Sequence, residues 1–203
     1  MARTDRRPRR RLDPDSRRAA ILEAAAAAFA AHPYAEVTIS SIAAEAYSSN
    51  ALVYRYFANK EDLYAEVVRV AIADLLTRQA EALDALPDGV PVRDRIRAAT
   101  MVYLDHIATH PDAWAMPMRR PGGEPAAVAE LRARTRCDYV KRLQGLLAPS
   151  TQARHDYALW GYFGFTDAAA LRWVDKGCPE EDRWALIDAA LGALEGALGD
   201  WAA

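Results

Sequence analysis

Two histidines that stand four positions apart are the first residues of this chain whose spacing suits chemistry. His106 and His110 would share one face of a helix, with Asp105 and Asp112 close by, and such a pair can bind a metal ion. A zinc-protease helix carries glutamate directly after its first histidine, whereas Ile107 stands there in this chain, and no third ligand follows by spacing. We therefore expect no metal site.

Other residue types used in catalysis also lack a supporting pattern. The two cysteines, Cys137 and Cys178, are too few for a disulfide framework and do not have the spacing of a zinc module. They have no pattern of basic neighbours that marks a nucleophile, although Arg136 adjoins the first. The sequence contains no glycine-rich phosphate loop and no Gly-x-Ser-x-Gly elbow. We expect a protein that is not an enzyme and needs no cofactor.

Charge is unevenly distributed along the 203 residues, although the net value is only −2. Residues 1–11 contain six arginines and one acidic residue, so the remaining residues carry a net charge of −7. A basic arm before a mildly acidic body suits contact with a polyanion, and a solubilising tail is the alternative. The longest uncharged stretch, Ala24 to Ala35, is shorter than the roughly 20 apolar residues of a membrane-spanning helix. We expect a cytoplasmic protein with no membrane partner.

The apolar spacing predicts an all-α protein in which three short helices precede a bundle of long ones. The first helix is expected from Arg17, with Ser16 as its N-cap, and His32-Pro33 ends it. Three prolines make 111–123 the least regular stretch that we expect. Long helices are expected near 60–84, 92–110, 124–147, 152–176 and 180–201.

Two short helices joined by a tight turn follow the first helix, and this arrangement suits a reader of double-stranded DNA. Thr38 is the expected N-cap of one and Ser49 that of the other, which runs from Asn50 to Tyr56. The major groove of B-DNA is about 12 Å wide and admits one helix, whose amino-terminal turn can reach base edges. The stretch 38–57 is therefore predicted to be a helix-turn-helix.

The side chains of this segment divide by the part of DNA that each suits. Asn50 can pair bidentately with adenine, while Ala51 and Leu52 offer apolar contact, most naturally with a thymine methyl group. Long hydroxyl-bearing side chains and groups at helix amino termini suit phosphate oxygens. The predicted phosphate contacts of this kind are Thr38, Tyr54, Tyr56 and Lys60.

Two strings carry a resemblance to a known family: Thr38-Ile39-Ser40-Ser41-Ile42-Ala43 and Val53-Tyr54-Arg55-Tyr56-Phe57-Ala58-Asn59-Lys60-Glu61-Asp62-Leu63. They closely resemble the amino-terminal domain of the TetR family of transcriptional regulators, over about Arg17 to Val67. The Tyr-x-Tyr-Phe-x-x-Lys-Glu-x-Leu ending is the distinctive part. The chain departs from the family where Tyr47-Ser48 replace the usual Gly-Val and where Leu52 replaces a common threonine.

The resemblance implies a homodimeric regulator whose two recognition helices enter successive major grooves of a near-palindromic operator. It also implies a second domain in which a small, largely apolar effector binds and changes DNA affinity. Carried over by position, it assigns Asn50, Ala51 and Leu52 to bases and adds Ser49 to the phosphate-facing residues.

The last expected helix carries a seam of large apolar residues beside a stripe of small ones. The seam is Trp184, Ile187, Leu191, Leu194, Leu198 and Trp201, and the stripe is Ala185, Ala189, Gly192, Gly196 and Gly199. Glycine in a helix interior costs about 1 kcal/mol, so close approach of a second helix is expected to compensate. With the resemblance, this pattern predicts a dimer interface, and packing within one subunit is the alternative. The predicted interface residues are Trp160, Gly161, Gly164, Ile187, Leu191, Gly192, Leu194 and Gly196.

An effector site is expected where methionines and aromatic residues of the middle helices face one another. Ordinary core packing is the alternative for each of them, and Asp167 and Arg136 suit a structural ion pair equally well. The predicted ligand-binding residues are Met101, Tyr103, Trp114, Met116, Met118, Tyr139, Phe163 and Asp167, with Trp173 as a further candidate.

These observations favour three regions: a basic arm (1–14), a helix-turn-helix DNA-binding domain (15–75), and a ligand-binding and dimerisation domain (76–203). The predicted function is a ligand-responsive transcriptional regulator, of the repressor type, that binds an operator as a homodimer. The alternatives are a small helical carrier or enzyme that uses the aromatic cavity, and an adaptor whose basic arm contacts an acidic protein or a membrane surface.

Overall fold

The computed structural model describes residues 13–147 and 150–199, and these residues form nine α-helices and no strand. The predicted all-α class is confirmed, while the arginine-rich arm and Trp201 lie outside the described residues. The helices are α1 (Pro14–Ala31), α2 (Ile39–Glu45), α3 (Asn50–Tyr56), α4 (Lys60–Asp84), α5 (Val92–Thr109), α6 (Pro111–Arg119), α7 (Ala126–Leu146), α8 (Ala153–Asp175) and α9 (Arg183–Leu198).

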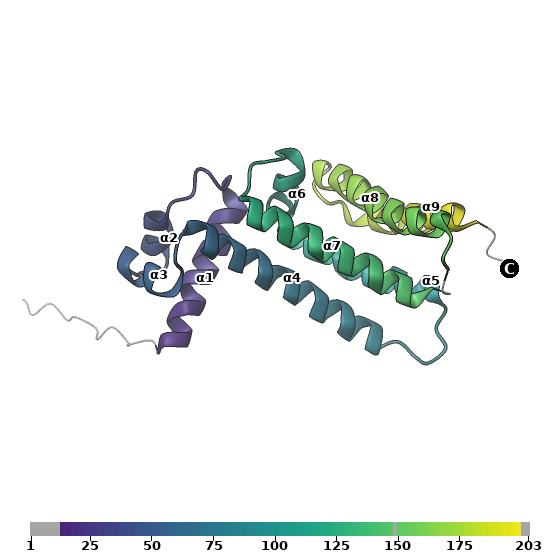
Figure 1. Ribbon diagram of the computed structural model, residues 1–203, viewed down its shortest axis with the longest axis horizontal. Coiled ribbons are helices and arrows are strands. Elements are labelled where there is room, and N and C mark those ends of the chain that lie inside the picture. Colours follow the sequence, from purple (N-terminus) through teal and green to yellow (C-terminus); the bar gives the residue numbers. More distant parts are fainter. Residues whose placement is uncertain (1–12, 148–149, 200–203) are drawn as a thin grey trace, which may run out of the picture.

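The first three helices pack with the start of α4 around a small core of their own. Ile21, Ile42, Val53 and Leu63 come from four different helices, and each exposes 1% or less of its surface. Because one apolar side chain from each helix meets at this point, α2 and α3 are held in a fixed mutual orientation. Helix α4 then leaves this unit and runs into the rest of the molecule (Figure 1).

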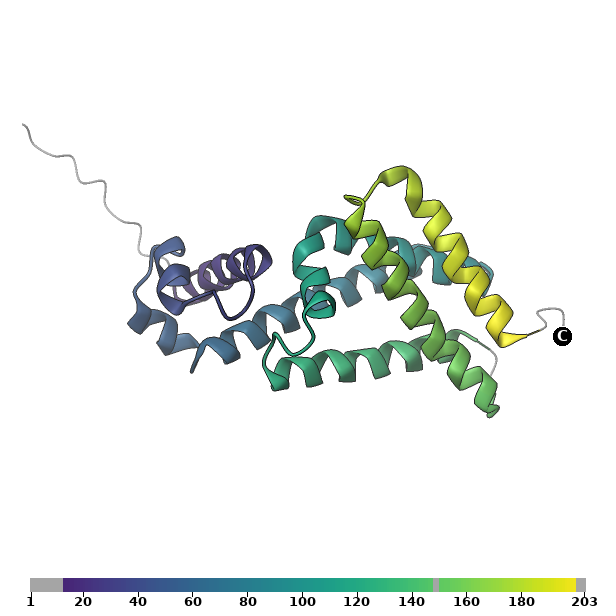
Figure 2. The ribbon, with the colours of Figure 1, turned by 90° about the horizontal axis from the view of Figure 1, so that it is seen from above.

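The larger unit contains α5 to α9 packed on the remainder of α4, with a second core. Helices α8 and α9 lie side by side along most of their length, and α9 also packs on α5 (Figures 1 and 2). Helix α7 contacts α4 on one side and α8 on the other. The two units therefore share α4.

Two boundaries differ from the sequence expectation. Helix α1 begins at Pro14, because the Asp13 carboxylate accepts from the backbone N–H of Ser16 at 2.9 Å, so Asp13 and not Ser16 is the N-cap. The stretch 111–123 is also more regular than expected, since α6 occupies most of it. Pro111 stands at the start of α6, where a missing N–H costs nothing, and Pro117 is accommodated inside this short helix.

Candidate functional site

Local capping sets the start of α2 and α3. The Thr38 hydroxyl accepts from the backbone N–H of Ser41 at 3.0 Å, and Ser41 Oγ in turn accepts from the Thr38 N–H, which forms a capping box. The Ser49 hydroxyl accepts from the N–H of Leu52 at 3.2 Å. Both expected caps are confirmed, and they place two exposed hydroxyl-bearing residues at the helix ends that were predicted to meet phosphates.

The leading turn of α3 is offered to solvent while its other face is buried. Asn50 and Ala51 are exposed, Leu52 is half-buried, and Val53 is fully buried against the amino-terminal core. The Asn50 amide donates to Ser40 Oγ at 2.8 Å, so a residue of α2 fixes the orientation of the predicted base reader. Sequence reasoning missed Ser40, because only its proximity across the turn marks it.

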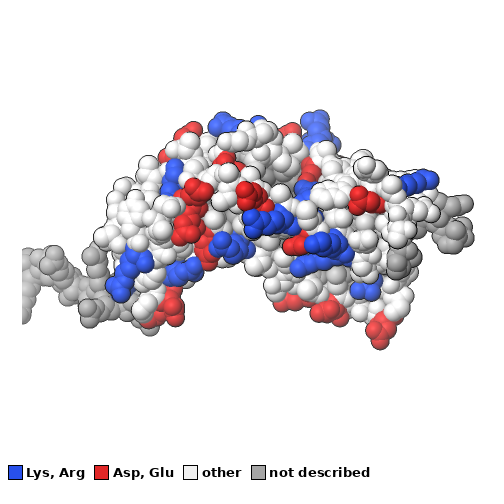
Figure 3. Space-filling model, viewed as in Figure 1, with Lys and Arg blue, Asp and Glu red and all other residues white. Residues whose placement is uncertain are grey.

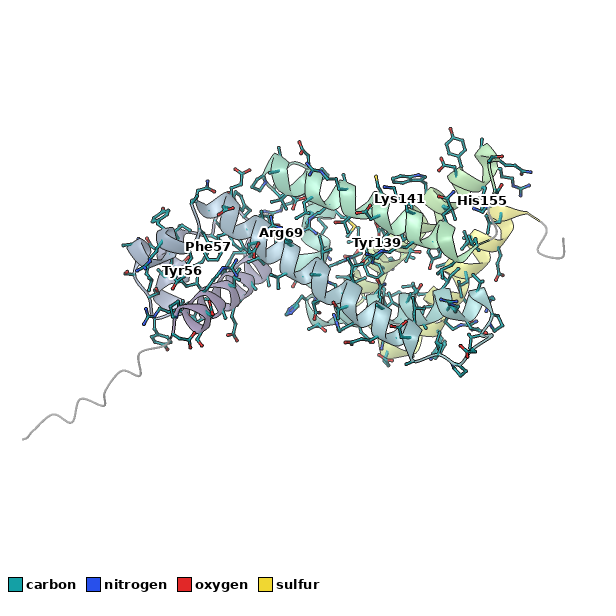
Figure 4. All side chains as sticks on the ribbon, turned by 60° about the horizontal axis from the view of Figure 1, so that its bottom comes forward. Tyr56, Phe57, Arg69, Tyr139, Lys141 and His155 are labelled. Carbon is teal, nitrogen blue, oxygen red and sulfur yellow. The ribbon has the colours of Figure 1, made fainter. Side chains whose placement is uncertain are left out.

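The two tyrosines of α3 lie on different sides of the helix, as their spacing predicts. Tyr54 is 54% exposed, whereas Tyr56 is half-buried and packs against the amino-terminal core beside the buried Phe57 (Figure 4). Arg55, which the sequence analysis left without a role, is exposed and is the one basic residue of α3. The exposed surface of α3 thus presents an amide, a phenol and a guanidinium.

Lys60 makes contacts within the domain that the sequence did not predict. Its ammonium donates to the carbonyl oxygens of Tyr34 and Val37 at 2.9 and 3.0 Å and lies 4.1 Å from the centre of the Tyr34 ring. These contacts tie the start of α4 to the connection between α1 and α2. In this arrangement two of its three N–H donors are already used, so the predicted phosphate contact of Lys60 would rely on the third.

The turn between α2 and α3 adopts the left-handed conformation that the missing glycine would favour. Tyr47 has a φ of +49° and is 93% exposed, and the N–H of Ser48 donates to the carbonyl of Ala43 at 2.8 Å. The hydroxyl of Ser48 is buried without a hydrogen-bond partner. The family's usual Gly-Val pair would avoid both features, so this turn keeps the helix-turn-helix shape with less suitable residues.

Positive charge is scarce on the described part of the amino-terminal unit. Residues 13–57 contain five acidic and three basic residues. In Figure 3 basic and acidic side chains are mixed over the face shown, with basic groups beside the grey amino-terminal segment. Hydroxyl groups of serine, threonine and tyrosine therefore form much of the polar surface around α3.

A polar link joins the two units. Tyr64 of α4 donates to Glu124 Oε2 at 3.3 Å, and Arg132 of α7 donates to the same oxygen at 3.1 Å. The Tyr64 ring also packs on Phe29 and Tyr34, with ring centres 4.6 and 5.2 Å away. The start of α7 is thus connected through one tyrosine to the connection that leads into α2.

The predicted ligand residues divide into a connected group and a looser one. Trp114 Nε1 donates to the Tyr103 hydroxyl at 2.9 Å, and that hydroxyl donates to Asp167 Oδ1 at 2.9 Å. Arg136 forms an ion pair with the other oxygen of Asp167 and lies 5.5 Å from the centre of the Phe163 ring. Burial, reinforced by the charge of Asp167, raises the pKa of Tyr103 well above its usual value.

Tyr139 completes this group from α7. Its ring lies 6.0 Å from that of Phe163, on the inward side of α7, whereas Lys141 of the same helix is exposed (Figure 4). Its hydroxyl is buried without a hydrogen-bond partner, and burial raises the pKa of Tyr139 to about 12. A buried hydroxyl without a partner is unusual in folded proteins and marks a place where a further polar atom would be favourable.

The methionines do not join this network. Met101, Met116 and Met118 are half-buried, and only Met101 packs against the larger core. Trp173 belongs to that core, with 2% of its surface exposed. One hollow in the described residues is lined by 141, 144–145 and 150–151. Another lies between the end of α8 and the start of α9 and includes Trp173 but none of the other predicted ligand-binding residues.

The middle of the apolar seam of α9 faces its own subunit, whereas Trp184 at its start is 58% exposed, and this corrects part of the predicted dimer interface. Ile187, Leu191 and Leu194 each expose 1% or less of their surface within the larger core. They were assigned to the interface because the seam and the small-residue stripe run along the same helix. The structure shows that these three residues pack inside the subunit, as the alternative held.

The other five predicted interface residues lie on an open face of α8 and α9. Gly161, Gly164, Gly192 and Gly196 are exposed, and a Cβ added at any of them would meet no atom within 4 Å. Exposed aromatic side chains accompany them: Tyr157, Trp160, Phe165 and Trp184 are between 40% and 75% exposed. We call this surface, formed by the exposed sides of α8 and α9, the α8–α9 face.

His106 makes a contact within the fold, whereas His110 is exposed. Arg78 lies 3.1 Å from His106 Nδ1, and burial together with the Arg78 charge lowers the pKa of His106. Asp105 pairs with Arg183 of α9. Within residues 13–147 and 150–199 no group of three or more His, Cys, Asp or Glu side chains is arranged to hold a metal ion. None of the helices described has both the length and the apolarity needed to cross a membrane.

Comparison with known proteins gives matches at both the sequence and the fold level. Residues 21–67 match the family model of bacterial regulatory proteins, tetR family. The HTH-type transcriptional repressor SCO4008 of Streptomyces coelicolor is 38% identical over 101 residues, which is 49% of this chain and 47% of the relative. The HTH-type transcriptional activator FasR of Mycolicibacterium smegmatis is 32% identical over 97 residues, 48% and 43% of the two chains. The chain thus covers a little under half the length of these curated relatives.

Solved structures extend the likeness over nearly the whole chain. A TetR-like regulator from Rhodococcus sp. RHA1 has a TM-score of 0.75 at 23% identity and covers 94% of this chain and 100% of its own. A tetR-family regulator from Streptomyces coelicolor has a TM-score of 0.74 at 22% identity, covering 92% and 80%. FadR from Bacillus subtilis, in complex with stearoyl-CoA, has a TM-score of 0.65 at 16% identity, covering 89% and 97%. These similarities establish an amino-terminal helix-turn-helix unit followed by a helical carboxy-terminal unit.

Proposed function

We propose that this chain, which belongs to the TetR family of transcriptional regulators, binds operator DNA as a homodimer and changes its DNA affinity when a small effector binds. We further propose that residues 15–75 form its DNA-binding domain and residues 76–203 its effector-binding and dimerisation domain. A repressor is the form we favour, because the relative with 38% identity is named a repressor.

The observation that carries the proposal is the presentation of the first turn of α3. Asn50 and Ala51 are exposed while Val53 and Phe57 anchor the helix from behind, each exposing 3% or less of its surface. Because Ser40 holds one N–H of the Asn50 amide, the other N–H and the carbonyl oxygen remain for bidentate pairing with adenine. We assign Ala51 and Leu52 to apolar base contacts.

The phosphate contacts would come from hydroxyl groups around this helix. Thr38 and Ser49 are exposed at the amino termini of α2 and α3, and the side chain of Tyr54 is exposed further along α3. Tyr56 is half-buried with its ring against the core, so only its hydroxyl end would meet DNA. Lys60 would contribute through its remaining N–H donor.

We assign the dimer contact to the α8–α9 face. Its glycines leave the helix backbones open to close approach, and its exposed aromatic side chains are the kind that a partner subunit buries. A second copy of the same face would be related by a two-fold axis, which is the commonest symmetry of homodimers. Such a dimer would present two copies of α3.

We place the effector between α5, α6, α7 and α8, at the group formed by Trp114, Tyr103, Asp167, Phe163 and Tyr139. All of them are half-buried, and Tyr103, Trp114 and Phe163 pack against the edge of the larger core. The buried hydroxyl of Tyr139 has no partner, and a polar atom of an otherwise apolar effector would supply one. The FadR structure in complex with stearoyl-CoA shows that a protein of this fold can hold a ligand with a long acyl chain, which supports the proposal.

The link between the effector group and α3 would pass through α6 and α7. Helix α6 carries Trp114 and packs on α1, and α7 carries Arg136 and Tyr139 and meets Tyr64 through Glu124. An effector that separates Arg136 from Asp167 would move α7 relative to α4. The distance between the two copies of α3 in the dimer would change as a result.

The test is selection of a preferred duplex from a random pool, followed by salt titrations of binding to the selected and to random duplexes. We expect affinity for both to fall as salt rises, because basic side chains that neutralise phosphates release counterions. Asn50→Ala should erode the preference at one base position by about 1–3 kcal/mol, whereas Tyr54→Phe should weaken binding to every duplex alike. No duplex binding at low salt would refute the proposal and favour the carrier alternative.

A further inference from the structure

The turn between α2 and α3 contains a residue that is both strained and fully presented to solvent. Tyr47 has a φ of +49°, in the left-handed region that bulky side chains rarely adopt. Tyr47 is 93% exposed, more than any other large apolar residue in the described part of the chain. The tyrosine ring therefore makes almost no contact within the chain that could offset the strain of its backbone.

The shape of the turn does not require a tyrosine. Backbone hydrogen bonds hold it: the N–H of Tyr47 donates to the carbonyl of Ala44 at 3.1 Å, and that of Ser48 to Ala43 at 2.8 Å. Glycine or asparagine would make the same bonds with less strain. Strain that persists at an exposed position is a reason to look for a contact outside the chain.

The position of Tyr47 limits what that contact can be. It stands two residues before Ser49, the N-cap of α3, and so lies at the edge of the surface that presents Asn50 and Ala51. This part of the domain has few cations, because residues 13–57 contain five acidic residues and only three basic ones. Neutral donors must therefore supply part of any phosphate binding here, and a phenol is the longest neutral hydroxyl donor that a side chain offers.

We propose that Tyr47 is an additional DNA contact, whose hydroxyl donates to a phosphate oxygen beside the groove that α3 enters. This inference rests on the proposed function, since it requires that α3 meets DNA. The contact is neutral, so it releases no counterion and adds nothing to the salt dependence of binding. It is also independent of base sequence, because a phosphate is the acceptor.

Two variants of the full chain separate this role from a purely structural one. Tyr47→Phe removes only the hydroxyl, so we expect an unchanged melting temperature and about a tenfold loss of affinity for random-sequence duplexes. Tyr47→Gly should lose at least as much affinity, while relief of the left-handed strain raises the melting temperature by about 2–4 °C. Both variants should keep the salt slope and the base preference of the wild type.

The measurement is fluorescence anisotropy with a pool of random-sequence duplexes and with the selected duplex, at several salt concentrations, beside thermal unfolding of each protein. Binding of DNA by the wild type tests the proposed function independently of Tyr47. If the wild type does not bind DNA, both the proposed function and the Tyr47 contact are refuted. If the wild type binds and either variant binds as tightly as the wild type, the contact through Tyr47 is refuted while the regulator remains. The expected result is a loss of affinity in both variants, at least as large in Tyr47→Gly as in Tyr47→Phe, with a raised melting temperature in Tyr47→Gly alone.

Discussion

Enlarging the glycines of the α8–α9 face should separate the subunits without harming either one. The perturbation is Gly192→Gln together with Gly196→Gln, which blocks close approach without adding apolar surface. In the isolated chain a Cβ at either position meets no atom within 4 Å, so the subunit has room for the new side chains. Glutamine also has a better helix propensity than glycine, and the pair should stabilise α9 by about 1 kcal/mol.

In the dimer the same side chains would meet the partner's helices four times, twice from each subunit. Overpacking costs about 1–3 kcal/mol at each site, so the dimer should lose at least about 4 kcal/mol over the four sites. That loss corresponds to an increase of roughly a thousandfold or more in the dimer Kd. Sedimentation equilibrium measures this change directly. Thermal unfolding gives a second reading, because Tm depends on protein concentration only while folding is coupled to dimerisation.

A matched control is Gly145→Gln on α7, which is also an exposed helical glycine with open space around its Cβ. The control should remain dimeric, and its Tm should rise with protein concentration as that of the wild type does. The double variant should sediment as a folded monomer with a Tm that is independent of concentration. If it sediments as a dimer with the affinity of the wild type, the interface lies elsewhere and the assignment of the α8–α9 face is wrong.

Two further predictions concern single side chains. Lys60→Met should lower the free energy of unfolding by about 2 kcal/mol, because two charged hydrogen bonds and the contact with the Tyr34 ring are lost, and urea denaturation measures this. If Lys60 acts chiefly on phosphate instead, stability will be unchanged and the salt slope of DNA binding will fall by about one. Tyr139→Phe should raise the free energy of unfolding at neutral pH by about 1 kcal/mol, because it removes a buried hydroxyl without a partner. Burial raises the pKa of Tyr139 to about 12, so the folded state holds this proton at higher pH than the unfolded state does. The part of the stability that requires a protonated phenol is therefore present below pH 10 and is lost between pH 10 and 12. Denaturation across that range should show a smaller decline in Tyr139→Phe, and an unchanged decline would contradict the burial of the phenol.

The short helices could be predicted from sequence because their signals are local. Thr38 and Ser49 cap α2 and α3 as expected, since the side chain and the N–H that it accepts from are three residues apart. The start of α1 was missed because Asp13 and Ser16 both suit an N-cap, and Pro14 at the first helical position favours the earlier one. Where two neighbouring residues both suit an N-cap, the sequence alone does not show at which of them the helix begins.

Features that depend on distant parts of the chain were predicted less well. Periodicity identified the apolar seam of α9, but it does not say whether that seam meets the same subunit or another, and Ile187 lies in the core of its own subunit. The link from Trp114 through Tyr103 to Asp167 joins three helices, so residue types alone indicated only a shared region. Lys60 follows the family pattern, yet its carbonyl partners, Tyr34 and Val37, are more than 20 residues away in the sequence.

The central claim is that the first turn of α3 enters the major groove twice in one complex. Guanine-methylation interference on the selected duplex tests it most directly, because methylation of guanine N7 blocks contacts in the major groove. We predict two patches of interference on one face of the duplex, centred about one helical turn or a multiple of it apart. A single patch, or binding that is indifferent to methylation in the major groove, would contradict the account.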